Sequence, residues 1–338
     1  MTTSADDLTI RPGTDQDIPA VIELMKSALG EGKIPRTPEF WMWKHRHNPF
    51  GKSPMWLAFS GSELVGVRLF MRWSFRNAAG YVQAVRAVDT ATAPAFQGRG
   101  IFKRLTLGLV DELKEQGAGF VFNTPNGKSM PGYLKMGWQP VGRTSFWLRA
   151  RHPVAIARRL LRIAGSPDAG QPAPQPPAEL VLNETSAEYL SERCMQVLPG
   201  YRTSLSSSFL RWRYQACPAA SYATFSCDPR RALVVTRLRL RGGLRELAVS
   251  ELLFEHSTRG MRAAVQSLRE SLRAQPSDYA IAALRQDASE AAVLAASGFV
   301  PAPNSGPTLT VRSLALTAPL ARFGASSLQA SMGDLELF

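Results

Sequence analysis

Cysteine is scarce in this chain of 338 residues. Cys194, Cys217 and Cys227 are odd in number, lie far apart and form no Cys-x-x-Cys pair, so we expect neither a disulfide framework nor a Cys/His zinc site. Long apolar runs are missing too. None approaches the roughly 18 residues that span a bilayer, so we expect no transmembrane helix. The first 20 residues carry acidic charge and no apolar core, so we expect no secretory signal peptide and favour a cytoplasmic location.

Histidine is almost as rare, with four residues, and only His45 and His47 stand close together. Side chains at positions i and i+2 of a helix point to different faces, so this pair does not favour a metal site. We therefore expect no metal cofactor.

Charge is strongly one-sided, with a formal net charge of +13. Arginine supplies 32 of the 40 basic residues. Such an excess can reflect a GC-rich genome, or it can indicate a polyanionic partner: nucleic acid, an anionic membrane or a phosphate-rich cofactor. No long basic run stands out, which makes nucleic acid the weaker prediction and leaves transfer RNA as an alternative.

A proline-rich stretch divides the chain. Residues 164–178 contain five prolines and no large apolar side chain, which is typical of a linker. Residues 151–164 place apolar side chains at helical spacing, which indicates a basic amphipathic helix that packs on its own domain or contacts a membrane weakly. The sequence therefore predicts a first domain over 1–150, the helix and linker over 151–178, a second domain over 179–315 and a tail over 316–338.

The second half repeats a piece of the first. Phe40-x-x-Trp43-Lys44 and Pro49 match Phe209-x-x-Trp212-Arg213 and Pro218, each separated by 169 residues. Both halves then show the apolar patterns of strand, strand, helix, strand and helix. A duplicated domain explains these matches.

One loop carries the strongest chemical signal. A predicted strand over Tyr81–Thr92 is followed by a glycine-rich segment, residues 97–102, and a helix from about Gly100. Backbone N–H groups at a helix N-terminus bind anions, and glycines let a phosphate approach the backbone closely. The segment therefore predicts a pyrophosphate site. It lacks the residue order of a nucleotide-triphosphate loop and the three glycines of a dinucleotide-binding turn.

The residues around this loop resemble the GCN5-related N-acetyltransferase (GNAT) superfamily. Gln97 and Gly100 match its acetyl-CoA loop, although Phe102 stands where a small residue is usual. Asn126 to Trp138 resembles the second motif, Asn-x-x-Ala-x-x-x-Tyr-x-x-x-Gly-Phe, and residues 9–18 look like the first strand and helix.

The resemblance implies an α/β fold of two tandem GNAT-like domains, each a mixed, mostly antiparallel sheet flanked by helices. It also implies acetyl-CoA or another acyl-CoA as cosubstrate. The residues that match cofactor-binding positions are Thr90, Ala91, Thr92, Gln97, Gly98, Arg99, Gly100, Ile101, Phe102 and Asn126.

Two residues are the catalytic candidates. Tyr133 matches the position that protonates the CoA thiolate in the superfamily. Asp89 is a carboxylate in an otherwise apolar strand, where an unpaired charge is costly. It can serve as base, as substrate anchor or as the partner of Arg86, although their odd separation predicts opposite faces.

Other candidates for the base remain open. His45 and His47 lie beside Trp41 and Trp43, and Glu251 lies on the strand of the second half that matches Asp89. In some multidomain relatives the C-terminal carboxylate acts as base, which here belongs to Phe338.

The second half looks degenerate. Its counterpart of the loop, residues 255–261, contains one glycine, and Leu294 stands where Tyr133 stands in the first half. We expect this half to be structural or to shape the acceptor pocket.

The leading hypothesis is an acyl-CoA-dependent N-acyltransferase acting on an amine of a small molecule, an amino sugar or a peptide. One alternative is peptidyl transfer from aminoacyl-tRNA, as in tandem GNAT-like proteins. Another is a non-catalytic protein that binds acyl-CoA as a sensor or scaffold.

Overall fold

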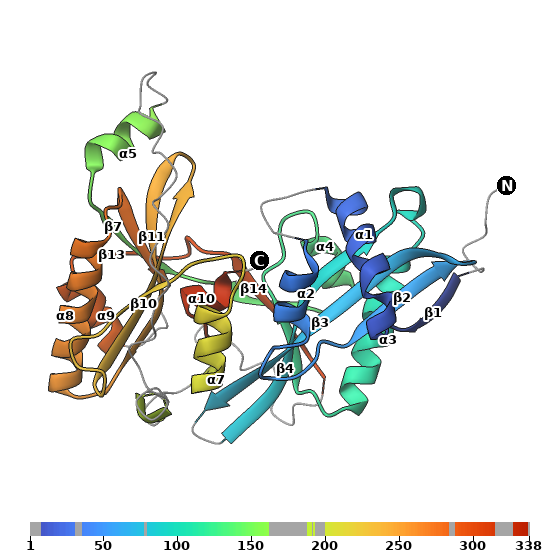
Figure 1. The fold of residues 1–338 in the computed structure, drawn as a ribbon, viewed down its shortest axis with the longest axis horizontal. Coiled ribbons are helices and arrows are strands. Elements are labelled where there is room, and N and C mark those ends of the chain that lie inside the picture. Colours follow the sequence, from blue (N-terminus) through green and yellow to red (C-terminus); the bar gives the residue numbers. More distant parts are fainter. Residues whose placement is uncertain are drawn as a thin grey trace.

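The computed structural model describes residues 8–30, 36–77, 80–161, 188–190, 192, 200–283, 288–314 and 327–336. Its strands form two sheets, which lie in two lobes with short helices between them (Figure 1). None of the helices in these ranges is long and apolar enough to cross a membrane. The predicted linker, residues 164–178, lies outside the described residues.

The first sheet has the order β1-β2-β3-β4-β5-β14-β6, with β8 and β15 added beside β3. Along the main path only β4 and β5 are parallel, and the other neighbours are antiparallel. β3 is buried over most of its length and β4 from Ala84 to Val88, as expected for strands that are covered on both faces. The strands are β1 (Leu8–Pro12), β2 (Met55–Ser60), β3 (Glu63–Asn77), β4 (Gly80–Thr92), β5 (Phe120–Asn123), β6 (Gln139–Arg143), β8 (Tyr201–Thr203), β14 (Thr308–Ser313) and β15 (Leu328–Gln329).

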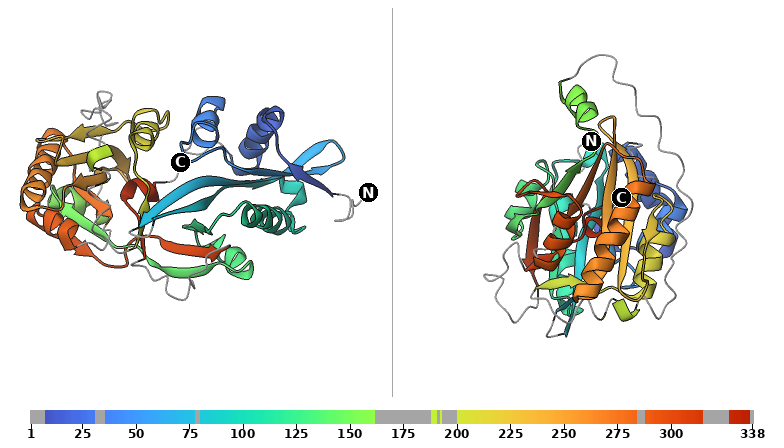
Figure 2. Two further views of the ribbon diagram at one scale, coloured as in Figure 1. Left: turned by 90° about the horizontal axis from the view of Figure 1, so that it is seen from below. Right: turned by 90° about the vertical axis from the view of Figure 1, so that its left-hand side faces the viewer.

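Helices cover both faces of this sheet (Figure 2). On one face, Val85, Ala87 and Val121 pack with α3 and α4. On the other, Ala84 and Val88 belong to the core that includes α1 and α2. The helices are α1 (Ile18–Leu29), α2 (Pro38–His45), α3 (Ile101–Glu115) and α4 (Met130–Lys135), with short 3-10 turns η1 (Asp15–Asp17) and η2 (Pro94–Phe96).

The second sheet repeats this topology. Its order β13-β7-β12-β11-β10-β9 corresponds to β6-β14-β5-β4-β3-β2, and β11 and β12 are parallel like β4 and β5. Residues of α8 and α9 pack against it in a core of their own. The elements are β7 (Phe146–Ala150), β9 (Ala223–Phe225), β10 (Ala232–Arg241), β11 (Leu244–Phe254), β12 (Tyr279–Ala283), β13 (Val300–Ala302), α8 (Thr258–Ala274) and α9 (Ala288–Ala296).

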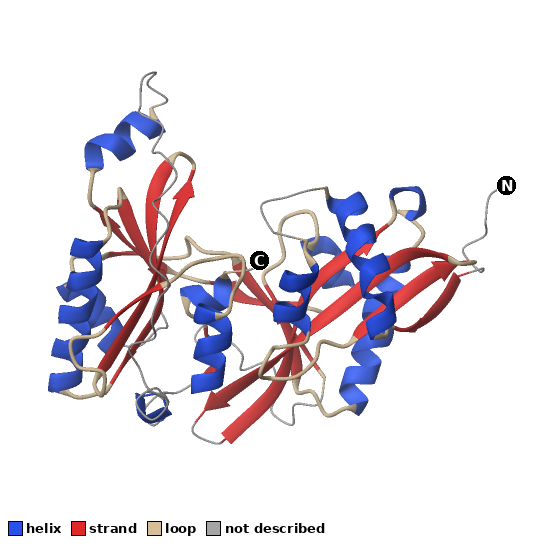
Figure 3. Ribbon diagram, in the orientation of Figure 1, coloured by secondary structure: helices blue, strands red, loops and turns tan. Residues whose placement is uncertain are grey.

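Strands cross between the two halves, whose sheets Figure 3 shows in separate lobes. The second half adds the short strands β8 and β15 to the first sheet, and the longer strands β7 and β14 are exchanged (Figure 1). β7 follows β6 in the chain but lies between β12 and β13 of the second sheet. β14 follows β13 but lies between β5 and β6 of the first sheet. The sheets therefore do not divide at residue 150, where the sequence analysis places a domain boundary, because residues 146–150 belong to the second sheet.

The repeated motif forms the junction between the halves. The indole N–H of Trp43 donates to the carbonyl of Trp212 at 2.7 Å, and that of Trp212 donates to the carbonyl of Trp43 at 2.8 Å. Their rings stack with centroids 5.1 Å apart. This reciprocal contact is what a local two-fold relation between the repeats predicts. One apolar core runs through it, since Phe40 and Phe209 belong to the same cluster.

Short elements complete the chain. They are α5 (Pro153–Leu160), α7 (Ser207–Leu210), a π-helical turn η3 (Arg211–Gln215) and α10 (Met332–Leu335). The basic helix predicted over 151–164 corresponds to α5, on which Val154 is 64% exposed. α10 packs on β11 and brings the end of the described chain between the lobes.

Candidate functional site

The end of β4 has a free backbone edge. β4 pairs with β5 only from Ala84 to Arg86, and β5 ends at Asn123. Thr90 to Thr92 are paired with β3 and, within the described part of the chain, with no strand on the other side. Backbone N–H and C=O groups on that edge can accept an extended ligand as a further strand would be accepted.

The glycine-rich loop follows immediately. Gly98 and Gly100 have φ of +78° and +75°, a region that favours glycine, and a Cβ on either would meet no atom within 4 Å. Gly100 is the N-cap of α3, and no side chain caps the helix. The first N–H groups of α3 are therefore available to an anion, as the sequence predicts.

The other predicted cofactor-binding residues differ in exposure and in what they contact. Gln97 is exposed and donates to the Thr92 carbonyl at 3.4 Å, while Arg99 lies over the Phe96 ring. Ile101 is buried in the core, so only its backbone can face a ligand. The Asn126 carboxamide accepts from the N–H groups of Lys128 and Ser129 at 3.0 Å each, so this side chain shapes the turn before α4.

Tyr133 points into the sheet and meets a buried arginine. Its side chain is 5% exposed, and its hydroxyl accepts from Arg68 Nη2 at 3.0 Å. Arg68 is fully buried and also donates to the Val88 carbonyl at 3.3 Å. Its guanidinium lies over the rings of Phe70, Phe102 and Tyr133, at 4.5, 5.5 and 5.6 Å from their centroids. Phe102 is thus part of this cluster, which explains the departure from a small residue.

Arg68 has no carboxylate partner among the residues that the structure describes, and its Nε has no hydrogen-bond acceptor there. A buried, uncompensated cation is costly and indicates a functional role. Arg68 is not among the residues predicted above. The sequence feature that could have indicated it is a charged residue within an apolar strand, the same feature that singled out Asp89.

Asp89 is the extra residue of a β-bulge. Arg68 pairs with Thr90 and Leu69 with Val88, so Asp89 has no partner in β3. Bulges re-aim side chains, and this one turns Asp89 toward α2. Its Oδ2 lies 2.7 Å from Lys44 Nζ and 2.9 Å from His45 Nε2.

A hydrogen-bonded chain extends from Asp89. The other ring nitrogen of His45, Nδ1, lies 3.0 Å from the hydroxyl of Ser53. Burial lowers the pKa of His45 despite the opposing hydrogen bond from Asp89, so the ring is neutral near pH 7. Burial alone would raise the pKa of Asp89, but the Lys44 ammonium and the His45 hydrogen bond outweigh it and hold that pKa well below its usual range. Asp89 is therefore a stable anion and a weak base.

A small cavity opens beside Asp89. Its volume is about 140 Å3, and Lys44, His45 and Asp89 line it together with residues of α1, α2 and the turn before α2. Its other lining residues are Ile22, Met25, Leu29, Arg36, Thr37, Phe40 and Trp41.

The remaining predicted residues lie elsewhere. His47 is exposed and does not line this cavity, and Phe338 lies outside the described residues. Arg86 does not pair with Asp89: it donates to the carbonyl of Asp334 in α10, and burial lowers its pKa to about 9. The predicted alternative of an Arg86–Asp89 pair is therefore wrong.

The second half has a shorter, capped segment at the place that corresponds to the glycine-rich loop. Three residues separate β11 from α8, against eight between β4 and α3, and the Ser257 hydroxyl caps α8 by accepting from Gly260 N–H at 3.0 Å. Leu294 is buried where Tyr133 stands in the first half. Ser250 is the bulge residue of β11 and so corresponds to Asp89. Its neighbour Glu251 accepts from Tyr214 at 3.0 Å, and Tyr214 is the repeat counterpart of His45.

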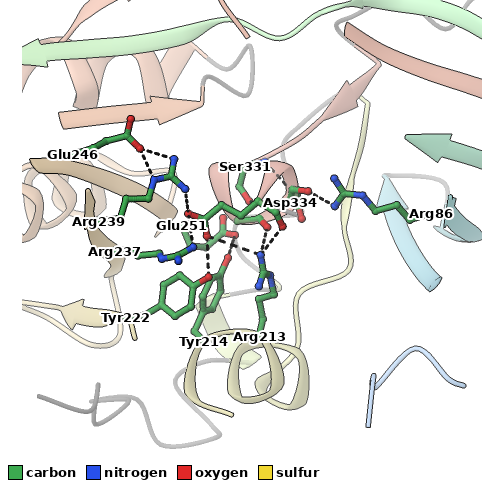
Figure 4. A network of polar contacts seen from close by, with 12 residues as sticks. Arg86, Arg213, Tyr214, Tyr222, Arg237, Arg239, Glu246, Glu251, Ser331 and Asp334 are labelled. Carbon is green, nitrogen blue, oxygen red and sulfur yellow. Dashed lines mark hydrogen bonds and ion pairs between the residues drawn. The ribbon is translucent and has the colours of Figure 1, made fainter. Parts of the chain in front are cut away.

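The end of the described chain fills this region (Figure 4). Arg213 donates to the carbonyls of Gly333 and Glu336, and the Glu336 carboxylate accepts from Tyr222 at 2.8 Å and Arg239 at 2.9 Å. Arg213 is the repeat counterpart of Lys44. Residues 333–336 therefore occupy the space beside Arg213.

Comparison with known proteins bears on the fold. Residues 9–141 match the family model described as the acetyltransferase (GNAT) domain. Among curated proteins, none matches this sequence.

Several solved structures are similar. A GCN5-related N-acetyltransferase from Anabaena variabilis is 12% identical with a TM-score of 0.63, over 91% of this chain and 73% of that one. Eis1 from Mycobacterium abscessus is 14% identical with a TM-score of 0.55, over the same shares. A putative acetyltransferase from Pyrococcus horikoshii is 11% identical with a TM-score of 0.52, over 97% and 96%. At such identities the likeness is one of fold, and it confirms the predicted mixed sheets flanked by helices.

Proposed function

We propose that the chain, of which residues 9–141 match the acetyltransferase (GNAT) domain model, is an N-acyltransferase that transfers an acyl group from acyl-CoA to an amine. The observation that carries this proposal is the coincidence of three features at one end of β4. They are the free strand edge at Thr90–Thr92, the uncapped glycine loop, and the hydroxyl of Tyr133.

The loop and the strand edge would hold acyl-CoA. N–H groups at the start of α3 suit a pyrophosphate, and Gly98 and Gly100 leave room for it. Arg99, Lys103 and Arg104 add positive charge around the loop. Backbone groups of Thr90 to Thr92 would bind the extended pantetheine arm and direct an N–H at the thioester oxygen.

The chemical step forms a carbon–nitrogen bond and breaks a carbon–sulfur bond. The lone pair of a neutral amine attacks the acyl carbon, and the electron pair of the C–S bond goes to sulfur. Tyr133 donates its phenolic proton to the sulfur, and it recovers a proton from water. The amine nitrogen releases one proton to water, which balances the reaction. Asp89 anchors the amine rather than taking this proton, because its pKa is held well below the usual range.

Arg68 positions the proton of Tyr133. Because the guanidinium donates to the phenolic oxygen, the phenolic O–H must point away from Arg68. A buried cation at this place also stabilises negative charge that develops on the leaving sulfur.

The second half would have no catalysis of its own. Its shorter loop and the Ser257 cap leave no counterpart of the pyrophosphate site, and Leu294 cannot donate a proton. We propose that this half completes the first sheet through β14 and holds α2 in place through Trp212.

Calorimetry with acetyl-CoA and longer acyl-CoAs tests the cofactor. We expect micromolar binding that Gly100→Glu abolishes, because a carboxylate would occupy the anion site. Gly117→Glu is the matched control: Gly117 has φ of +80°, is equally open and lies at the other end of α3. The proposal fails if no acyl-CoA binds or if both variants bind equally. Tight transfer RNA binding in its place would favour peptidyl transfer, and binding without turnover would favour a sensor.

A further inference from the structure

We propose that the cavity beside Asp89 binds the acceptor, and that the acceptor is a monoamine with a compact apolar body, such as an arylalkyl amine. The inference rests on the proposed function and specifies its substrate class. The cavity adjoins Asp89, one residue before the free edge at Thr90. An amine held there would stand next to the strand that would bind the thioester.

Asp89 offers one carboxylate oxygen to a ligand. Both Lys44 and His45 contact its Oδ2, and Oδ1 has no contact with the described residues. The side chain is 19% exposed, which is enough for a small ligand to reach it. The carboxylate keeps its charge under ordinary conditions, because Lys44 and the neutral His45 favour the anion. An incoming ammonium group would find one acceptor in a fixed place, and it would lose one proton to water before its lone pair attacks the thioester and a second one after the C–N bond has formed.

The walls select an apolar body. Ile22, Met25 and Leu29 come from α1, and Phe40 and Trp41 come from α2. The volume of about 140 Å3 is close to that of an apolar protein cavity of about 150 Å3 that takes up benzene. Aromatic faces also attract a cation. The cavity therefore fits a ring or a short alkyl chain that bears one amine.

Polar bodies would bind poorly. An amino sugar would place hydroxyls against Ile22, Met25 and Leu29, whose side chains offer no hydrogen-bond partner. Buried hydroxyls without partners are costly. A second ammonium group is also disfavoured, because the described lining holds one carboxylate, that of Asp89, and the cations Arg36 and Lys44 would repel a further positive charge.

The test compares amines at saturating acetyl-CoA. We expect kcat/KM for phenethylamine to exceed that for glucosamine and for 1,4-diaminobutane by at least tenfold. Asp89→Asn should lower kcat/KM for phenethylamine by about tenfold or more and leave the Kd for acetyl-CoA unchanged. Leu29→Trp, at a half-exposed position of the cavity wall, should lower kcat/KM for phenethylamine because it fills the cavity, and it changes no charge. Asp15→Asn, a surface carboxylate outside the cavity, is the matched control.

The outcomes separate this inference from the proposed function. Calorimetry with phenethylamine alone reports on the cavity even if acetyl-CoA does not bind. The inference is overturned if glucosamine is the better acceptor, or if neither Asp89→Asn nor Leu29→Trp weakens phenethylamine binding. Loss of acetyl-CoA binding in the wild-type protein would instead overturn the proposed function.

Discussion

Two charged residues in apolar strands mark the candidate site. Arg68, which is buried, and Asp89, which is partly exposed, lie on the neighbouring strands β3 and β4. The two side chains differ in the partners that they contact. Asp89 has two cationic or hydrogen-bonding partners, whereas Arg68 has only a carbonyl, a phenol and three aromatic rings. Arg68 therefore has no carboxylate to balance its charge among the described residues.

The first prediction concerns the leaving thiol. Tyr133→Phe should lower kcat by about 10²–10⁴-fold, the usual contribution of a positioned acid, with little effect on the Kd for acetyl-CoA. Arg68→Met should lower kcat less. The check is to compare acetyl-CoA with an acetyl thioester of an acidic aryl thiol, which needs no proton donor on leaving.

The aryl thioester should restore much of the lost rate in both variants, because its sulfur leaves as a stable anion. A purely structural role for Arg68 would lower both rates alike. Arg68→Lys separates charge from geometry, since it keeps the positive charge but loses the planar guanidinium that donates to Tyr133 and lies over the rings.

His45 gives a prediction for stability against pH. Its folded-state pKa lies below the ordinary value of 6.5 because of burial. The unfolded chain therefore binds more protons than the folded protein below pH 6.5, so stability is full above that pH and falls on acidification. The loss is about 1.4 kcal/mol for each pH unit until the folded pKa is reached.

Urea unfolding at pH 7.5 and 5.5 measures this loss. Wild type should lose more unfolding free energy between these values than His45→Gln, by at most about 1.4 kcal/mol, because the Gln amide can still bond to Asp89 and Ser53 but does not titrate. Asp89 does not interfere, because its pKa is lowered and it titrates only in stronger acid. Equal losses in the two proteins would contradict the burial argument.

At the scale of elements, the apolar patterns predict the strand and the helix on either side of the candidate loop. The strand over Tyr81–Thr92 and the helix from about Gly100 agree with β4 and α3 within a residue or two. The uncapped loop is also where the sequence places it. These features are local, so spacing along the chain suffices to specify them.

Features that depend on strand register or on the packing of distant elements cannot be predicted from local apolar patterns. Alternation along β4 predicts that Arg86 and Asp89 face opposite ways, and the bulge at Asp89 breaks that alternation. The partners of Asp89, Lys44 and His45, come from a helix whose position no local pattern fixes. The cavity follows from the same packing, so the sequence suggests Asp89 as a substrate anchor but cannot show the walls around it.

The junction between α2 and η3 provides an element-scale prediction. Trp43→Phe removes one of two reciprocal hydrogen bonds and part of a stacked pair, which should cost about 1–3 kcal/mol of unfolding free energy. Trp212→Phe should cost a similar amount. The double variant measures their coupling in a thermodynamic cycle, and we expect about 0.5–3 kcal/mol because the residues are in contact. Additive losses would argue against a joined pair.

At the scale of the molecule, the strand exchange ties the lobes together. The first sheet needs β14 from the end of the chain, and the second needs β7 from before its own elements. One core cluster includes residues of both halves, such as Trp43 and Leu253. Neither half holds all its own strands, so unfolding one should expose apolar surface of the other.

The last prediction is that the halves fold only together. A fragment of residues 1–150 would leave β5 and β6 without the strand between them and would expose β7 as an unpaired apolar segment, so it should aggregate or lack a cooperative transition. Co-expressed residues 1–170 and 171–338 keep every strand and should assemble into a soluble complex that binds acetyl-CoA. Circular dichroism and calorimetry should show one unfolding transition for the whole chain. Two separate transitions, or a well-folded 1–150 fragment, would mean that the exchange does not couple the lobes.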